Sequence, residues 1–278
     1  MLTFSDFFLK LNFCMKNINE LKNKYDQIYL NDNKEYFSKY INGVDISETN
    51  RVVLSNLPDL NNKVIVDLGC GDGELISKIA ELGAKKAIGI DYSLPAIEIA
   101  KQKYTAKNLN FECSNIDQFN QEVDIIITNG TLEHLDEPLD TLINIRKKIK
   151  KNGLVYITCP HFYNLRGFIW VTLNKLLNVP MSLTDIHNIT PNDIELWSKL
   201  SHFKLLKQVS YDLKRSNGIL MINDMNKRLT NALKDSNLPN NNVHSLLKFC
   251  NDFFDYQEKN SDSIKLEGMS KLYILSPL

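Results

Sequence analysis

Three glycines and two aspartates are the residues of this 278-residue chain whose types and spacing most clearly indicate chemistry. Gly69, Gly71 and Gly73 occupy every second position of the segment that separates an apolar run from a helical apolar pattern. Asp67 and Asp91 lie at the ends of two apolar runs. Glycine adopts positive φ and lets a ligand approach the backbone closely. An acid at the end of the second strand of such a unit can accept hydrogen bonds from both ribose hydroxyls. The pattern therefore predicts a site for a nucleoside.

The charge beside the glycines indicates which nucleoside binds. Dinucleotide-binding folds usually carry Gly-x-Gly-x-x-Gly and seat a pyrophosphate on the helix amino terminus, whereas the spacing here is Gly-x-Gly-x-Gly. Asp67 and Asp72 flank the position that a phosphate would occupy, and like charges repel. A sulfonium amino acid with a free ammonium group suits this field. The segment predicts S-adenosylmethionine in preference to NAD, against the alternative of a turn that serves chain geometry alone.

The elements that position these residues alternate between strand and helix. The expected order is strand 63–68, helix 74–82, strand 87–91, helix 93–105, strand 109–113, strand 123–129, helix 138–150 and strand 154–159. Such alternation is typical of a parallel sheet with helices on both faces. Ligands bind at the carboxyl ends of the strands in these sheets, and the glycines and acids fall there. We therefore predict an α/β, Rossmann-like, doubly wound fold.

Five segments also match the motifs of one known family: Asp67–Gly73, Asp91, Asn115–Asp117, Val123–Asn129 and Leu132–Leu135. On these segments, residues 63–160 resemble a class I S-adenosylmethionine-dependent methyltransferase. The last segment, Leu-Glu-His-Leu, resembles the small-molecule O-methyltransferase branch. The resemblance implies a mostly parallel sheet with an antiparallel last strand, which we expect from 203–211 and 271–275. About 60 residues separate these two strands where the family has a short turn, so we also expect helical cap insertions.

The resemblance assigns a role to each expected cofactor-binding residue. The methionine part would be held by Asp67 and by the turn of Gly69, Cys70, Gly71 and Gly73. Asp91 corresponds to the acid that binds the ribose, and Tyr92 to a side chain that packs on the adenine. Ile116 and Asp117 correspond to the adenine contact, and Asn129 to a residue whose backbone carbonyl faces the ammonium group.

A general base helps methyl transfer to a hydroxyl, because the acceptor must lose a proton. Histidine is the natural candidate, since its unperturbed pKa of roughly 6.5 lies near operating pH. By position, His134, His161 and His187 can reach the pocket. Each is a catalytic candidate, and each could instead orient a loop or line the pocket wall. Glu133 with His134 could contribute to a divalent metal site, but no further ligand is identifiable, so we predict none.

Composition favours a cytoplasmic enzyme with a small acceptor. Lys plus Arg and Asp plus Glu number 33 each, so no global field steers the chain toward nucleic acid or an anionic membrane. The five cysteines form no Cys-x-x-Cys pair, which disfavours a disulfide frame and favours a reducing compartment. No stretch approaches the roughly 18 apolar residues of a membrane span. The turn 129–132 lacks the Asn/Asp-Pro-Pro-aromatic sequence of methyltransferases that act on adenine amines or glutamine.

The remaining segments are expected to cap the core. We expect an N-terminal helical cap at 1–57, a core at 58–211 with a cap loop at 161–188, a helical insertion at 212–268 with helices near 217–235 and 242–257, and a last core strand at 269–278. Residues 1–15 predict an amphipathic helix or an upstream extension, since charges interrupt the apolar run and no signal-peptide cleavage site follows. Thr190 and Pro191 predict a helix start. Insertions of this length can also form a dimer face, so a homodimer is possible.

These patterns together predict an S-adenosylmethionine-dependent methyltransferase that acts on a hydroxyl, in preference to an amine, of a small molecule or sugar. Two alternatives stay open. A methyltransferase-like binding or regulatory subunit without turnover would be indicated by a damaged cofactor motif, and none is visible. An NAD-dependent oxidoreductase is opposed by the glycine spacing and by Asp67.

Overall fold

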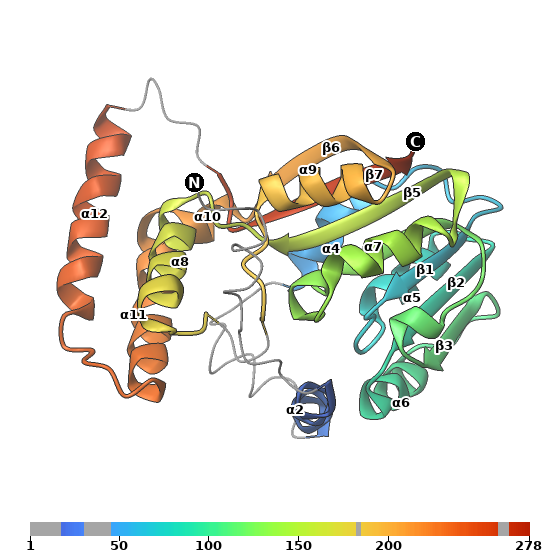
Figure 1. Ribbon diagram of the computed structural model, residues 1–278, viewed down its shortest axis with the longest axis horizontal. Coiled ribbons are helices and arrows are strands. Elements are labelled where there is room, and N and C mark those ends of the chain that lie inside the picture. Colours follow the sequence, from blue (N-terminus) through green and yellow to red (C-terminus); the bar gives the residue numbers. More distant parts are fainter. Residues whose placement is uncertain (1–17, 31–45, 182–184, 261–266) are drawn as a thin grey trace, which may run out of the picture.

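The sheet has the predicted doubly wound topology. The computed structural model describes residues 18–30, 46–181, 185–260 and 267–278 (Figure 1). Its seven-stranded sheet has the order β3-β2-β1-β4-β5-β7-β6. The strands are β1 (Val64–Leu68), β2 (Lys86–Asp91), β3 (Leu109–Cys113), β4 (Val123–Asn129), β5 (Ile149–Pro160), β6 (Phe203–Tyr211) and β7 (Ser270–Pro277). Only β7 runs antiparallel to its neighbours among these strands, which confirms the mixed sheet with an antiparallel last strand.

Helices cover both faces of the sheet because the central strands are apolar on both sides. On one face, α5 (Glu74–Glu81) and α6 (Leu94–Lys103) pack Ile76 and Ile97 onto the sheet, with α4 (Ile46–Ser55) beside them. On the other face, α7 (Pro138–Arg146) and α9 (Pro191–Leu200) bury Leu142 and Ile194. Burial of such side chains contributes about 1.5–3 kcal/mol each. The α9 start is as predicted: the Thr190 and Asp193 side chains form a reciprocal capping box.

The connection between α7 and β5 differs from the sequence-based expectation. The helix predicted to reach residue 150 ends at Arg146, and the strand predicted to begin at 154 begins at Ile149. Ile149 is buried and pairs with Val123, while the Lys150 ammonium contacts Asp124 at 3.0 Å. Pairing with β4 therefore outweighs the helical tendency of the lysine-rich segment 146–151, in which only Arg146 belongs to α7.

Helices outside the sheet form a separate cluster. They are α8 (Leu165–Leu177), α10 (Leu213–Ser216), α11 (Gly218–Asp235) and α12 (Val243–Lys259), drawn away from the sheet in Figure 1. Trp170 of α8, Met225 of α11 and Leu247 of α12 belong to one buried group. The two helices expected in the insertion are confirmed. The expectation of a loop at 161–188 is wrong, because that segment contains the 13-residue helix α8. The domain boundaries themselves stay a prediction.

The amino-terminal part is described only in two helices, α2 (Ile18–Leu30) and α4. The predicted amphipathic helix at 1–15 and the aromatic residues of 31–45 lie outside the described residues. In α2, Ile28 is buried, and the helix packs against α6. Within the described ranges no helix combines the length and apolarity needed to cross a membrane.

Candidate functional site

A cavity of about 1040 Å³ opens at the carboxyl ends of the parallel strands. Its size is that of a large ligand site. The cavity wall includes nine of the predicted cofactor-binding residues: Asp67, Gly69, Cys70, Gly71, Asp91, Tyr92, Ile116, Asp117 and Asn129. The tenth, Gly73, does not line it. Two 3₁₀ turns, η1 (Ile116–Gln118) and η2 (Leu132–His134), supply further wall residues.

The glycine turn needs glycine for two different reasons. Gly71 has φ of +54°, and a Cβ there would lie 2.5 Å from the Tyr29 hydroxyl, so the turn and α2 pack tightly over the cavity. Gly73 has φ of +81° at the start of α5, and its Cβ would lie 2.5 Å from the Phe111 ring. Gly73 therefore serves the packing of α5 on the sheet, while Gly71 shapes the cavity wall.

Two buried aspartates dominate the electrostatics beside this turn. Asp67 is 1% exposed, and its Oδ1 has no hydrogen-bond partner among the described residues. Burial, with a smaller effect of the Asp91 charge, raises the pKa of Asp67 to about 7. Asp91 accepts hydrogen bonds from the backbone N–H groups of Gly71 and Ser93, each at 2.9 Å. Burial raises the pKa of Asp91, and these hydrogen bonds oppose that rise.

The arrangement suits a cation and disfavours a diphosphate. A carboxylate removed from water without a partner is strongly destabilised, and a ligand ammonium at Asp67 would relieve this. A third carboxylate, Asp72, lines the same wall and is paired with Lys103 at 2.7 Å. Moreover, the Gly71 N–H already donates to Asp91, whereas a dinucleotide site would direct turn amides at a phosphate. The orphaned Asp67 oxygen and the tight glycine cradle thus fit S-adenosylmethionine.

Helices α2 and α4 make contacts beside the cavity that the sequence did not single out, and Asn50 of α4 lines the cavity itself. The Ser93 hydroxyl donates to Asp26 of α2 at 2.7 Å. Asn50 of α4 donates to Glu74 at 3.0 Å and accepts from the Asn129 amide at 3.2 Å. The sequence predicts an N-terminal helical cap at 1–57, but no local pattern identifies Asp26 or Asn50.

The Asn129 side chain is fixed from two sides. The Thr158 hydroxyl donates to Asn129 Oδ1 at 2.7 Å, and Asn129 Nδ2 donates to Asn50. The Asn129 backbone carbonyl, at the carboxyl end of β4, accepts a long contact of 3.4 Å from the Thr131 hydroxyl. This carbonyl therefore retains acceptor capacity for a ligand ammonium.

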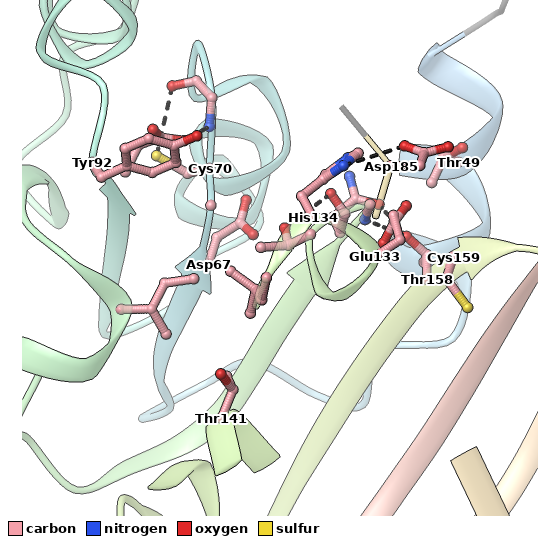
Figure 2. Close-up of a pocket in the computed structure, with 18 of the residues that line it drawn as sticks. Thr49, Asp67, Cys70, Tyr92, Glu133, His134, Thr141, Thr158, Cys159 and Asp185 are labelled. Carbon is pink, nitrogen blue, oxygen red and sulfur yellow. Dashed lines mark hydrogen bonds and ion pairs between the residues drawn. The ribbon is translucent and has the colours of Figure 1, made fainter. Parts of the chain in front are cut away.

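A cluster of titratable side chains, separate from Asp67, lies around η2 in the same cavity (Figure 2). His134 Nδ1 is 3.2 Å from Asp185 Oδ1. Asp185 is held there because the N–H groups of Ile186 and His187 donate to the Glu133 carbonyl at 2.9 and 3.1 Å. The structure thereby brings His134 beside an acid 51 residues away, which no pattern in the sequence indicated.

Glu133 is also part of this cluster. Its side chain is 3% exposed, and its Oε2 has no hydrogen-bond partner within the described chain. Burial raises the pKa of Glu133 to about 7, although His134 opposes the rise. Among the described residues, no group of three or more His, Cys, Asp or Glu side chains has metal-binding geometry.

The other two histidine candidates do not line the cavity. His161 is 3% exposed and lies 3.9 Å from Glu267, and burial lowers its pKa to about 4. His187 donates from Nε2 to the Leu135 carbonyl at 2.8 Å, so it fastens the turn after η2. Of the three, the structure brings only His134 to the cavity.

The comparisons with known proteins agree with this geometry. A family model described as a methyltransferase domain matches residues 59–267. A putative protein N5-glutamine methyltransferase of Methanocaldococcus jannaschii is 31% identical over 114 residues, covering 38% of this chain and 57% of that protein. A ubiquinone biosynthesis O-methyltransferase of Coxiella burnetii is 26% identical over 156 residues, covering 53% of this chain and 66% of that protein. The chain thus spans 57% to 66% of the length of these relatives.

Solved structures show the same fold. A putative methyltransferase from Haloferax volcanii, solved in complex with the Trm112 methyltransferase activator, superposes with a TM-score of 0.61 at 16% identity. The match covers 92% of this chain and 97% of that one. At this identity the likeness concerns the fold alone.

Proposed function

The chain belongs to the S-adenosylmethionine-dependent methyltransferases, and we propose that it methylates a hydroxyl of a small molecule or sugar. The observation that carries the proposal is the occurrence, in one cavity, of an unpaired buried carboxylate suited to the cofactor and of a histidine whose Nδ1 lies 3.2 Å from an acid. Asp67 and His134 are the central residues of these two parts.

The cofactor end follows from the carboxylates described above. Asp67 would hold the ammonium group, with the Asn129 carbonyl as a second acceptor. Asp91 would accept hydrogen bonds from the ribose hydroxyls while keeping its contact with the Gly71 N–H. Ile116, which is buried in the cavity wall, and the exposed Asp117 would flank the adenine, with Tyr92 on its face.

The acceptor end would supply the proton transfer. The bound cofactor provides a methyl group on a sulfonium. His134 Nε2 would take up the proton that the acceptor oxygen loses on methylation, as the sulfonium becomes a neutral thioether. Asp185 on the opposite ring nitrogen would orient the imidazole and stabilise its charged form. A positioned base of this kind contributes typically about 10² to 10⁴-fold, and holding the oxygen near attack distance contributes more.

The turn after β4 supports a hydroxyl acceptor over glutamine or a nucleic-acid amine. Family members that methylate such amines carry an Asn/Asp-Pro-Pro-aromatic turn there, whereas this chain has Asn129-Gly-Thr-Leu132. Three further points stay predictions. They are that the protein has no nucleic-acid partner, that it can form a homodimer, and that it is cytoplasmic.

Transfer of a labelled methyl group tests the proposal. The full chain is incubated with labelled S-adenosylmethionine and, in parallel, hydroxylated aromatics, sugars, transfer RNA and protein extract. Small hydroxy compounds should be labelled, and label found only in RNA or protein would remove the acceptor assignment. His134→Gln should then lower kcat by about 10² to 10⁴-fold, and Asp185→Asn by less. His244→Gln, on the exposed face of α12, is the matched control. A loss confined to His187→Gln would reassign the base.

A further inference from the structure

The cap side of the cavity contains a buried arginine that the proposed methyl transfer does not use. Arg166 of α8 lines the cavity and is 4% exposed. Its Nη2 donates to Asp224 of α11 at 2.7 Å, and its Nε is buried without a hydrogen-bond partner among the described residues. A guanidinium has five N–H donors, so a single contact leaves most of them available.

The surroundings of Arg166 favour an anion. It belongs to the first turn of α8, where the helix dipole stabilises negative charge. Arg228 of α11 lines the same wall, with its guanidinium carbon 5.6 Å from the centre of the Trp170 ring and its Nη2 donating to the Met181 carbonyl at 3.1 Å. Two guanidinium groups therefore reach the cavity from the cap, while the cofactor end is lined by Asp67 and Asp91.

The Arg166–Asp224 pair is incompletely satisfied for a buried ion pair. Both side chains are almost fully removed from water, with 5% and 6% of their surface exposed. Such a pair offsets its desolvation only when further hydrogen bonds satisfy the remaining donors. Guanidinium groups match carboxylate and phosphate oxygens particularly well, because their planar donors can bind two oxygens at once.

We propose that Arg166 binds an anionic group of the methyl acceptor, a carboxylate or a phosphate. The acceptor would then be a hydroxy acid or a phosphorylated hydroxy compound, with its hydroxyl directed to His134 and its oxyanion to the cap. The identification of this anionic ligand as the methyl acceptor rests on the proposed function. The anion site itself is independent of turnover.

Binding of simple anions tests the site directly. The full chain is saturated with S-adenosylhomocysteine, and the affinities of benzoate, inorganic phosphate and neutral benzamide are measured by ligand-observed NMR. Benzoate or phosphate should bind more tightly than benzamide, and the preferred anion identifies the class of acceptor. Arg166→Gln should weaken anion binding by about tenfold or more, as expected for loss of a charge-assisted hydrogen bond, and leave benzamide unchanged.

Two further variants separate an anion site from a structural tie between α8 and α11. Asp224→Asn removes the competing carboxylate and should tighten anion binding severalfold. Lys175→Gln removes an exposed cation from the same helix and should change nothing. Equal affinity of the wild type for benzamide and both anions would overturn the proposal, as would unchanged anion affinity in Asp224→Asn or in a folded Arg166→Gln.

The same titrations distinguish the two proposals. If the wild type binds S-adenosylhomocysteine but shows no preference for anions, the anion site fails and the methyltransferase assignment stands. If the anions bind but S-adenosylhomocysteine does not, the cofactor assignment fails and the anion site stands.

Discussion

Replacing Asp67 by Asn should stabilise the ligand-free protein and weaken cofactor binding, two effects of opposite sign. Burial raises the pKa of Asp67 from 3.8 to about 7 in the folded chain. The folded state then holds more protons than the unfolded state between these values, so this group reduces stability as pH rises from about 4 to 7. Roughly three pKa units at 1.36 kcal/mol each set a ceiling of about 4 kcal/mol. Asn carries no charge and removes this loss.

Calorimetry over pH measures the stability effect. At pH 8 the Asn variant should melt several degrees higher than the wild type, since about 1 kcal/mol moves the midpoint of a chain of this size by about 2–4 °C. At pH 4, where Asp67 is protonated in the folded state, the advantage should disappear. Titration with S-adenosylmethionine at pH 8 should show weaker binding by the variant, because the ammonium loses its carboxylate. A variant that is less stable at pH 8 and binds the cofactor normally would refute the reasoning.

Three further predictions concern the same wall. Asp91→Ala should weaken S-adenosylmethionine and S-adenosylhomocysteine by roughly 100-fold, the value of two charge-assisted hydrogen bonds at about 1.5 kcal/mol each; unchanged affinity in titration calorimetry would remove the ribose assignment. Gly71→Ala should abolish binding through strain and the clash with α2, whereas Gly218→Ala, which has φ of +66° and open space around it, should retain binding; equal binding by both variants would contradict the tight cradle. Cofactor affinity should rise between pH 6 and about 7.5 as Asp67 ionises and fall above about 8 as the ligand ammonium deprotonates. The Asp67→Asn variant should not show the rise in affinity between pH 6 and 7.5, and a wild-type affinity that does not change with pH would contradict the role of Asp67 as an ionising partner of the ligand.

Local signals predicted much of the core. The limits of β3, β4 and β6 and the Thr190 cap match the structure, because strand apolarity, turn residues and capping side chains act over a few neighbouring positions. Long-range contacts decided the failures. Ile149 joins β5 because it pairs with Val123, which the lysines around it do not indicate. The segment expected to be a loop forms α8 because Trp170 packs against buried residues of α11 and α12.

The candidate site divides in the same way. Asp67, Asp91, Gly69 and Gly71 lie within one short unit, so spacing alone predicted their convergence on the cavity. The histidines could be placed only near strand ends, and strand position does not fix where a ring points. His161 turns into the interior toward Glu267. The pairing of His134 with Asp185 depends on a tertiary contact, which no spacing along the sequence contains.

The most direct test is a crystal structure of the full chain grown with S-adenosylmethionine and NAD together. We expect density for S-adenosylmethionine alone, with its ammonium against Asp67, its ribose against Asp91 and its methyl group directed to His134. A diphosphate seated on the glycine turn, or an adenosyl ligand whose ammonium lies away from Asp67, would contradict the account.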